Sequence, residues 1–301
     1  MSPYDNAQIV AIFGKQVQVS INNKEIIEAK LQNSAGSVLC GDFVELINDN
    51  GNYKINKRLD RKNYLYRIKE NQIRQNLSAN IDRLLIICSV NPGIDNKLID
   101  KIIIVCHKQN IYPVLIINKI DLINNSQKKH KTRDMTKKDI EKLVDCYSKI
   151  MDVFLVSALD IFSYDGFIKS FQPQQINMLT GESGVGKSTL TNALTKNENV
   201  IETCKTNDKG VGRHTTCTTQ MYDAINNSKI IDSPGLRDFI GSKIDKKDIK
   251  NGFVEFFDVS CGCKYKNCYH INEPNCAVKD AVKNKTIARF RYDNYLNFLK
   301  T

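Results

Sequence analysis

The sequence lacks any apolar run close to the roughly 18–20 residues that a membrane-spanning helix needs. Its first residues, Met-Ser-Pro-Tyr-Asp-Asn-Ala, also lack the basic start and the long apolar stretch of a secretory signal peptide. No internal repeat is recognisable. We therefore expect a cytoplasmic protein that has no membrane partner.

Acidic residues are the scarcer charged class, because 33 Asp and Glu stand against 44 Lys and Arg. The formal net charge is +11 and the pI is near 9.1. Such an excess favours a polyanionic partner, since binding releases the counterions that surround phosphates, and nucleic acid is the first candidate. A lysine-rich surface without such a partner would give the same balance, so charge supports this interpretation without deciding it.

The first part of the chain has β-type patterning only. The 301 residues, 41% of them hydrophobic, suffice for about two domains with real cores. Up to about Ile55, short β-type runs alternate with Asn and Gly turns, which predicts a small barrel. These runs are Gln8–Phe13, Gln16–Ile21, Val38, Asp42–Ile47 and Tyr53–Ile55. The charged stretch 57–63 then predicts a basic connector.

From Ile81 onward, apolar strands alternate with helical segments, which is typical of a parallel sheet covered by helices on both faces. The expected strands are Leu84–Val90, Val114–Ile117, Val153–Val156, Ile176–Leu179 and Ser228–Ile231, and the expected helices lie near 97–109, near 137–149 and from Lys187 to Leu194. A last helix carries Ile287, Phe290, Leu296 and Leu299. We therefore predict an all-β barrel (1–70), a central α/β domain (71–240) and a small, mainly helical C-terminal domain (241–301).

The cysteines divide into a scattered set and a cluster. Of ten, six are scattered: Cys40, Cys88, Cys106, Cys146, Cys204 and Cys217. Cys263, Cys268 and Cys276 crowd around His270, which favours a metal site over disulfides. Three thiolates and one imidazole suit tetrahedral Zn²⁺ and leave no open position, so we expect one structural zinc. Cys261 is an alternative ligand.

The segment Gly181-Glu182-Ser183-Gly184-Val185-Gly186-Lys187-Ser188 fits the phosphate-binding pattern G-x-x-x-x-G-K-[ST]. In this pattern the glycines let backbone amides wrap the phosphates, and the following helix presents its positive end to the anion. Lys187 is expected to contact the β- and γ-phosphates, and Ser188 to hold Mg²⁺. Thr189 completes the predicted phosphate contacts.

Asn118-Lys119-Ile120-Asp121 follows an expected strand, at the sheet edge where open α/β sheets bind ligands. The Asp121 carboxylate can accept hydrogen bonds from the guanine N1–H and amino group, which adenine does not offer. The tetrapeptide alone is common, but Ser157 and Ala158 at the end of the next strand can support the base. GTP is therefore favoured over ATP.

Asp232-Ser-Pro-Gly235 follows the last expected strand and matches D-x-x-G, although a Ser-Pro-Gly turn alone is common. Asp232 is expected to reach Mg²⁺ through water, and the Gly235 amide to sense the γ-phosphate. The phosphate loop thus comes after the guanine-reading motif, whereas it comes first in ordinary GTPases. The order of the motifs is rotated.

Leu236 stands where many GTPases carry a water-orienting Gln, and its side chain cannot polarise water. His214, in the segment 212–216, is the candidate replacement, although a lone histidine is more often an exposed loop residue. Thr215 and Thr216 compete for the Mg²⁺ position in the same segment, and spacing does not separate them.

Together these motifs resemble the circularly permuted, small-subunit-dependent GTPases of the RsgA (YjeQ) family. The resemblance covers nearly the whole chain. It also includes Arg61-Lys-Asn63 with Leu65 and Arg67, Ala79-Asn-Ile-Asp82, and Cys263 through Glu273-Pro-Asn-Cys-Ala-Val278. The sequence departs from the family pattern at Ser233 and Cys217, where the family usually has Thr.

The resemblance implies an N-terminal OB-fold, a permuted GTPase domain and a zinc-bearing C-terminal domain. It also implies that the protein acts as a monomer late in the maturation of the 30S subunit and its 16S rRNA. The subunit would stimulate GTP hydrolysis, with His214 as the catalytic histidine and Lys187 and Gly235 assisting. Two alternatives remain. One is a permuted GTPase that acts on another ribosomal or RNA target, such as large-subunit assembly, and the other is a slow GTP-dependent RNA clamp, which the replacement of Gln by Leu236 suggests.

Overall fold

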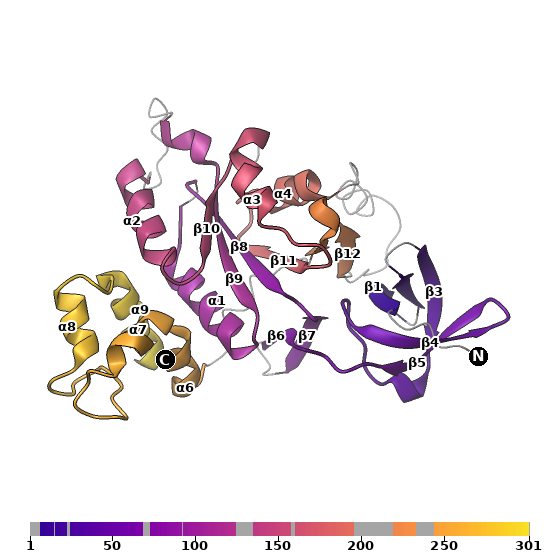
Figure 1. Cartoon of the computed structure of the whole chain (residues 1–301), viewed down its shortest axis with the longest axis horizontal. Helices are drawn as coiled ribbons and strands as arrows, with labels where there is room; N and C mark the ends of the chain where they lie inside the picture. Colours follow the sequence, from indigo (N-terminus) through magenta and orange to yellow (C-terminus); the bar gives the residue numbers. More distant parts are fainter. Residues whose placement is uncertain are drawn as a thin grey trace.

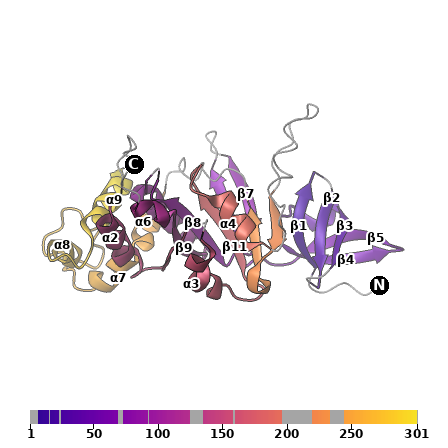
Figure 2. The same cartoon turned by 90° about the horizontal axis from the view of Figure 1, so that it is seen from above.

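The computed structural model describes residues 7–14, 16–22, 25–68, 73–91, 93–124, 135–157, 160–195, 219–232 and 244–300. Three parts lie in a row along the longest axis: a β-barrel at one end, a helix-covered sheet in the middle and a helical unit at the other end (Figure 1, Figure 2). Within the described ranges, no helix is both long enough and apolar enough to cross a bilayer.

The predicted N-terminal barrel is confirmed. Its strands are β1 (Ala7–Phe13), β2 (Gln16–Ile21), β3 (Glu25–Leu31), β4 (Phe43–Asp49) and β5 (Asn52–Arg58). They pair in the order β1-β2-β3-β5-β4, and β1 also pairs with β4, which closes the ring. Strand β3 was missed because most of its residues are exposed, and Val38 lies outside any strand.

A separate hairpin connects the barrel to the central sheet. Strands β6 (Tyr64–Ile68) and β7 (Arg74–Ala79) form a two-stranded sheet and lie between the two larger parts (Figure 1). The predicted basic connector ends immediately before this hairpin. The hairpin itself was not predicted.

The central sheet has the predicted α/β organisation. Its strands are β8 (Arg83–Ser89), β9 (Tyr112–Asn118), β10 (Asp152–Leu155), β11 (Ile176–Gly181), β12 (Gln220–Asp223) and β13 (Lys229–Asp232). They lie in the order β10-β9-β8-β11-β13-β12. All neighbours are parallel except β12, which is antiparallel to β13 and was not predicted.

Helices cover both faces of this sheet. The α helices are α1 (Asn96–Lys108), α2 (Lys137–Tyr147), α3 (Asp165–Lys169) and α4 (Lys187–Leu194). Leu84 and Ile86 of β8 share a core with α1 and α2, whereas the alternating Leu85 and Ile87 share a core with α3 and α4. This alternation is what a strand buried on both faces requires.

The C-terminal unit is helical, as predicted. It contains α6 (Lys246–Gly252), α7 (Val254–Ser260), α8 (Ala277–Lys283) and α9 (Arg289–Lys300). Aromatic rings of Phe253, Phe256 and Tyr295 form its centre, with ring centroids 5.1–5.2 Å apart. Helix α6 packs directly against α1: a Cβ added to Gly252 of α6 would lie only 2.6 Å from Cγ1 of Ile104 in α1.

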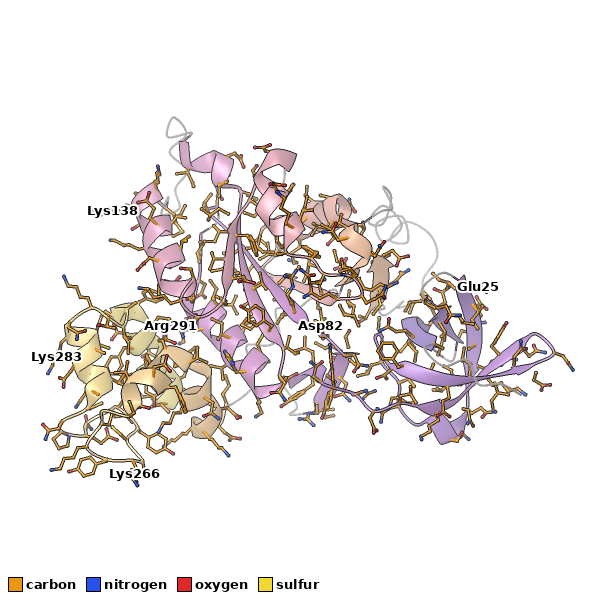
Figure 3. The ribbon with its side chains drawn as sticks, in the orientation of Figure 1. Glu25, Asp82, Lys138, Lys266, Lys283 and Arg291 are labelled. Carbon is orange, nitrogen blue, oxygen red and sulfur yellow. The ribbon has the colours of Figure 1, made fainter. Side chains whose placement is uncertain are left out.

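Arg291 ties the helical unit to the central sheet (Figure 3). Its buried guanidinium donates to Asp100 of α1 at 2.6 Å and to both carboxylate oxygens of Glu255 at 2.7 and 2.9 Å. Asp100 also accepts from the hydroxyl of Tyr147 and the amide of Asn294, each at 2.7 Å. Burial lowers the pKa of Arg291, but the two carboxylates more than offset this, so the pKa is raised and the guanidinium stays charged.

Arg291→Ala should lower the free energy of unfolding by about 3–5 kcal/mol, because removing one partner leaves a buried carboxylate without its compensating charge. Urea unfolding followed by circular dichroism would measure the change. Arg289→Ala is the matched control, since Arg289 lies on the same helix with a side chain 74% exposed beside Asp293. It should change stability by no more than about 0.5 kcal/mol. Equal effects of the two substitutions would contradict the assigned role of Arg291.

Candidate functional site

A glycine-rich loop joins β11 to α4 at the carboxyl edge of the sheet. Gly186 caps α4 in a left-handed conformation, with φ 94°. A Cβ there would lie 2.3 Å from Nδ2 of Asn118, and a Cβ at Gly181 would lie 2.2 Å from the carbonyl oxygen of Ile87. These two positions therefore require glycine, because the loop passes directly against β8 and the end of β9.

Lys187, the first residue of α4, folds its side chain back over the loop. Its Nζ donates to the carbonyl oxygen of Gly181 at 2.8 Å and to that of Glu182. Ser183 and Gly184 of the loop are exposed, and so are Ser188 and Thr189 in the first turn of the helix. The loop, the ammonium group and the positive end of α4 thus present an accessible site suited to an anion.

The end of β9 is bonded directly to this loop. Asn118 is fully buried, and its Nδ2 donates to the carbonyl oxygen of Val185 at 2.8 Å. The next residue, Lys119, donates through Nζ to the carbonyl oxygens of Gly184 at 2.5 Å and Asn91 at 3.3 Å. Two motifs that the sequence separates by more than sixty residues therefore form one structural unit.

Asp121 lies beyond Asn118 on the short 3-10 helix η2 (Ile120–Asn124). Its Oδ1 accepts a hydrogen bond from the Ser157 hydroxyl at 2.5 Å, and Ser157 in turn donates its backbone N–H to Oγ of Ser163 at 2.9 Å. Asp121 and Ser157, which the sequence analysis assigned separately to the base, thus contact each other in the fold. Ser163 was missed, because no motif marks a hydroxyl that supports another residue's backbone.

Asp232 ends β13, which runs parallel to β11 with Met178 opposite Ile231. Parallel strands bring their carboxyl ends to one edge, so Asp232 lies on the edge from which the glycine-rich loop departs. The remaining predicted site residues lie outside the described part of the chain: Ala158, His214, Thr215, Thr216 and Gly235.

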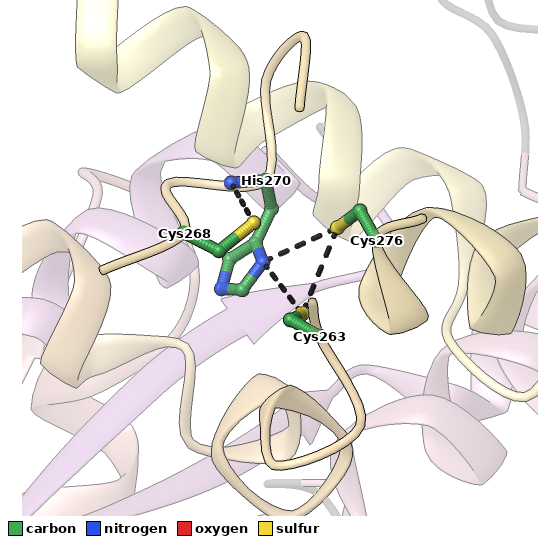
Figure 4. A group of neighbouring side chains, drawn as sticks. All are labelled: Cys263, Cys268, His270 and Cys276. Carbon is green, nitrogen blue, oxygen red and sulfur yellow. Dashed lines mark hydrogen bonds between the residues drawn. The ribbon is translucent and has the colours of Figure 1, made fainter. Parts of the chain in front are cut away.

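Cys263, Cys268, His270 and Cys276 come together in the helical unit, with their ligand atoms all within 4.8 Å of one another (Figure 4). Nδ1 of His270 lies 3.6 Å from Sγ of Cys263 and 3.4 Å from Sγ of Cys276, and the two sulfurs are 3.9 Å apart. Tetrahedral Zn–S bonds of about 2.3 Å would place two sulfurs about 3.8 Å apart. The geometry therefore suits a tetrahedral metal ion.

The surroundings of this cluster also favour a cation. Burial raises the pKa of the Cys268 thiol to about 12, so thiolates here need a nearby positive charge. Burial lowers the pKa of His270, which keeps the imidazole neutral, the form that binds metals. The turn between the ligands is fixed by Glu273, which accepts from the backbone N–H groups of Tyr269 and Ile271 at 2.7 and 2.8 Å.

Comparisons with known proteins agree with this arrangement. The family model described as RsgA GTPase matches residues 58–240, more than half of the chain. A small ribosomal subunit biogenesis GTPase RsgA 2 from Bacteroides thetaiotaomicron is 32% identical over 300 residues, which cover 95% of this chain and 94% of that protein. The RsgA of Phocaeicola vulgatus is 34% identical over 273 residues, which cover 89% and 84%.

Two solved structures have the same fold. YjeQ from Thermotoga maritima has a TM-score of 0.76 and 27% identity, and the match covers 98% of each chain. YloQ, described as a circularly permuted GTPase, has a TM-score of 0.76, covers 99% of this chain and 94% of its own, and is 24% identical. The latter likeness concerns the fold alone.

Cys276→Ser should abolish metal binding by the helical unit, because it removes one of four ligands from a closed site. Metal content measured by atomic emission should fall at least about tenfold, together with the helical signal of this unit. Cys261→Ser is the matched control, since the exposed Cys261 thiol donates to the carbonyl oxygen of Asp258 instead. Metal loss in both variants, or in neither, would refute the four-residue assignment.

Proposed function

Because the chain belongs to the RsgA GTPase family, we propose that it binds guanine nucleotides, hydrolyses GTP and assists the late maturation of the small ribosomal subunit. The observation that carries this proposal is the hydrogen bond from Asn118 to the carbonyl oxygen of Val185. It joins the base-reading segment to the phosphate loop, so one nucleotide can reach both.

Two groups of residues would hold the nucleotide. The base would lie against Asn118, Lys119, Asp121, Ser157 and Ala158, and the phosphates against Gly181, Glu182, Ser183, Gly184, Val185, Gly186, Lys187, Ser188 and Thr189. The Asp121 carboxylate would accept from the guanine N1–H and amino group, with Ser157 holding it in place. The ammonium of Lys187 would exchange its present carbonyl partners for the β- and γ-phosphates.

Ser188 and Asp232, with Thr215 or Thr216, would hold Mg²⁺, since hydroxyl and carboxylate oxygens are its usual protein ligands. Mg²⁺ would neutralise charge on the phosphate oxygens when the nucleotide is bound. His214 would orient the attacking water, and the Gly235 amide would respond to the γ-phosphate. The exposed position of Ser188 at the start of α4 supports its part in this assignment.

We assign the metal of the C-terminal cluster as one structural Zn²⁺. Three thiolates and one imidazole are the donors that zinc prefers, and the distances among them agree with a tetrahedral site. All four positions would be filled by protein, which leaves no place for a substrate. The zinc would therefore hold together a small unit that carries the exposed side chains of Tyr265, Tyr269 and Ile271.

We further propose domain bounds of 1–70, 71–240 and 241–301, and a GTP-dependent cycle of a cytoplasmic monomer. The barrel and the zinc-bearing domain would dock on 16S rRNA in the GTP-bound state, and hydrolysis would release the protein. The net charge of +11 supports an RNA partner, and OB-type barrels commonly bind oligonucleotides.

GTP hydrolysis measured with and without purified small subunits tests this function. We expect small subunits to raise the hydrolysis rate, and large subunits to have little effect. His214→Ala should lower the stimulated rate at least about tenfold, because water positioning typically contributes more than that, while GDP affinity stays unchanged. Stimulation by large subunits instead would favour another ribosomal target, and an unchanged rate for His214→Ala would remove its catalytic role.

A further inference from the structure

The barrel and the central sheet share one continuous strand ladder. Strand β1 of the barrel pairs with β12, Ala11 opposite Gln220, and β12 pairs with β13, Gln220 opposite Asp232. Both views place β12 beside β1, at the edge where the sheet meets the barrel (Figure 1, Figure 2). Ala11, Gln220 and Asp232 therefore form a cross-strand row that runs from the barrel to the proposed Mg²⁺ carboxylate.

A bulge in β1 makes this continuity possible. The pairing of β1 with β2 shifts register between Ile9 and Ala11, so Val10 is an extra residue. Bulges bend a strand and redirect a side chain. Before the bulge β1 pairs with β4 and closes the barrel, and beyond it β1 pairs with β12. Val10 packs in the core of the central sheet, whereas Ile9 packs in the barrel core.

Polar contacts also hold the barrel against the segments that connect it to the central sheet, and this junction is called the joint below. Asp42 is fully buried and accepts from Nε and Nη2 of Arg61 at 2.6 and 2.7 Å. The amide of Asn80 donates to the carbonyl oxygen of Gly41 at 2.9 Å, and a Cβ at Gly41 would lie 2.2 Å from the carbonyl oxygen of Ala79. The barrel therefore cannot tilt freely on its connector.

These contacts give a role to two family motifs that the nucleotide site leaves unused. The first motif is Arg61-Lys-Asn63, and the second is Ala79-Asn-Ile-Asp82, which contains Asn80. Asn63 accepts from the backbone N–H of Ile81 at 2.8 Å and donates to its carbonyl oxygen at 2.7 Å. Both motifs thus serve the joint between barrel and sheet rather than the nucleotide.

We infer that β1 is a positioning strand for Asp232: the barrel fixes β12, and β12 fixes the end of β13. The inference rests on the proposed function, which assigns Asp232 to Mg²⁺. It implies that a disturbance of the joint changes how Mg²⁺ strengthens nucleotide binding. It should leave base recognition unchanged, because Asp121 follows β9, which is three strands away from β13 in the sheet.

Val10→Ala and Val17→Ala provide a matched pair for the test. Both make the same substitution at a buried position of the barrel, 6% and 1% exposed, but Val10 faces the central core and Val17 the barrel core. General weakening of the barrel should affect both variants alike. Loss of positioning should appear only in Val10→Ala.

The first readout is the affinity for a fluorescent GDP, titrated over Mg²⁺ concentration and in excess EDTA. In Val10→Ala, the Mg²⁺ concentration for half-maximal strengthening of GDP binding should rise at least about threefold, with the EDTA affinity unchanged. The second readout, hydrogen exchange without nucleotide, should show faster exchange in 220–223 and 229–232 for Val10→Ala alone.

The outcomes separate the inference from the function it rests on. If the wild-type protein bound no guanine nucleotide, the proposed function and this inference would both be overturned. If the wild type bound GDP, and both variants showed the same Mg²⁺ dependence and the same hydrogen-exchange pattern as the wild type, only the inference would be overturned. A changed EDTA affinity in Val10→Ala would also overturn it, because the disturbance would then reach beyond the Mg²⁺ side of the site.

Discussion

One hydrogen bond, from the Asn118 amide to the carbonyl oxygen of Val185, holds the proposed nucleotide site together. It is fully buried and joins two loops that leave different strands. Gly186 allows the approach, because any side chain there would occupy the space of the Asn118 amide. Together with the hydrogen bond from Lys119 to Gly184, this contact keeps the base-reading segment beside the phosphate loop, so both can act on one ligand.

The sheet explains why a rotated motif order keeps the site intact. Ligand loops need only leave the carboxyl ends of neighbouring parallel strands, whatever their succession along the chain. Strand β8 lies between β9 and β11, so both motif-bearing strands flank it. The rotation instead changes what is attached to the sheet: the barrel adds its β1 at one edge, and α6 and Arg291 fasten the helical unit to α1 near the other.

Local patterns in the sequence were sufficient for the barrel, most strands of the sheet and the cluster of three cysteines and one histidine that could hold a metal ion. Two of these features are short-range, namely the strand-loop-helix setting of Gly181–Lys187 and the spacing of Cys263 to Cys276. They can therefore be recognised without knowledge of the fold. The exposed β3 and the four-residue strand β12 carry too little apolar patterning to be recognised.

Contacts between distant segments could not be predicted. Nothing in the sequence near Val10 indicates that a bulge turns its side chain into another core, and nothing near Arg291 identifies Asp100, 191 residues away, as its partner. Such pairs depend on how whole elements pack, which single-sequence periodicity does not encode. The same limit applied to Ser163, whose support of Ser157 follows from the course of a loop.

In the proposed site two separated loops bind opposite ends of one guanine nucleotide, and the nucleotide affinities of an Asp121→Asn variant provide the decisive test. An amide at this position donates toward the base, so it suits the 2-carbonyl of xanthine and opposes the 2-amino group of guanine. We expect the variant to lose GDP affinity at least about tenfold and to gain affinity for xanthosine diphosphate, whereas Lys187→Ala should weaken the binding of both nucleotides. An Asp121→Asn protein that still preferred GDP to the same degree as the wild type would contradict the proposed site.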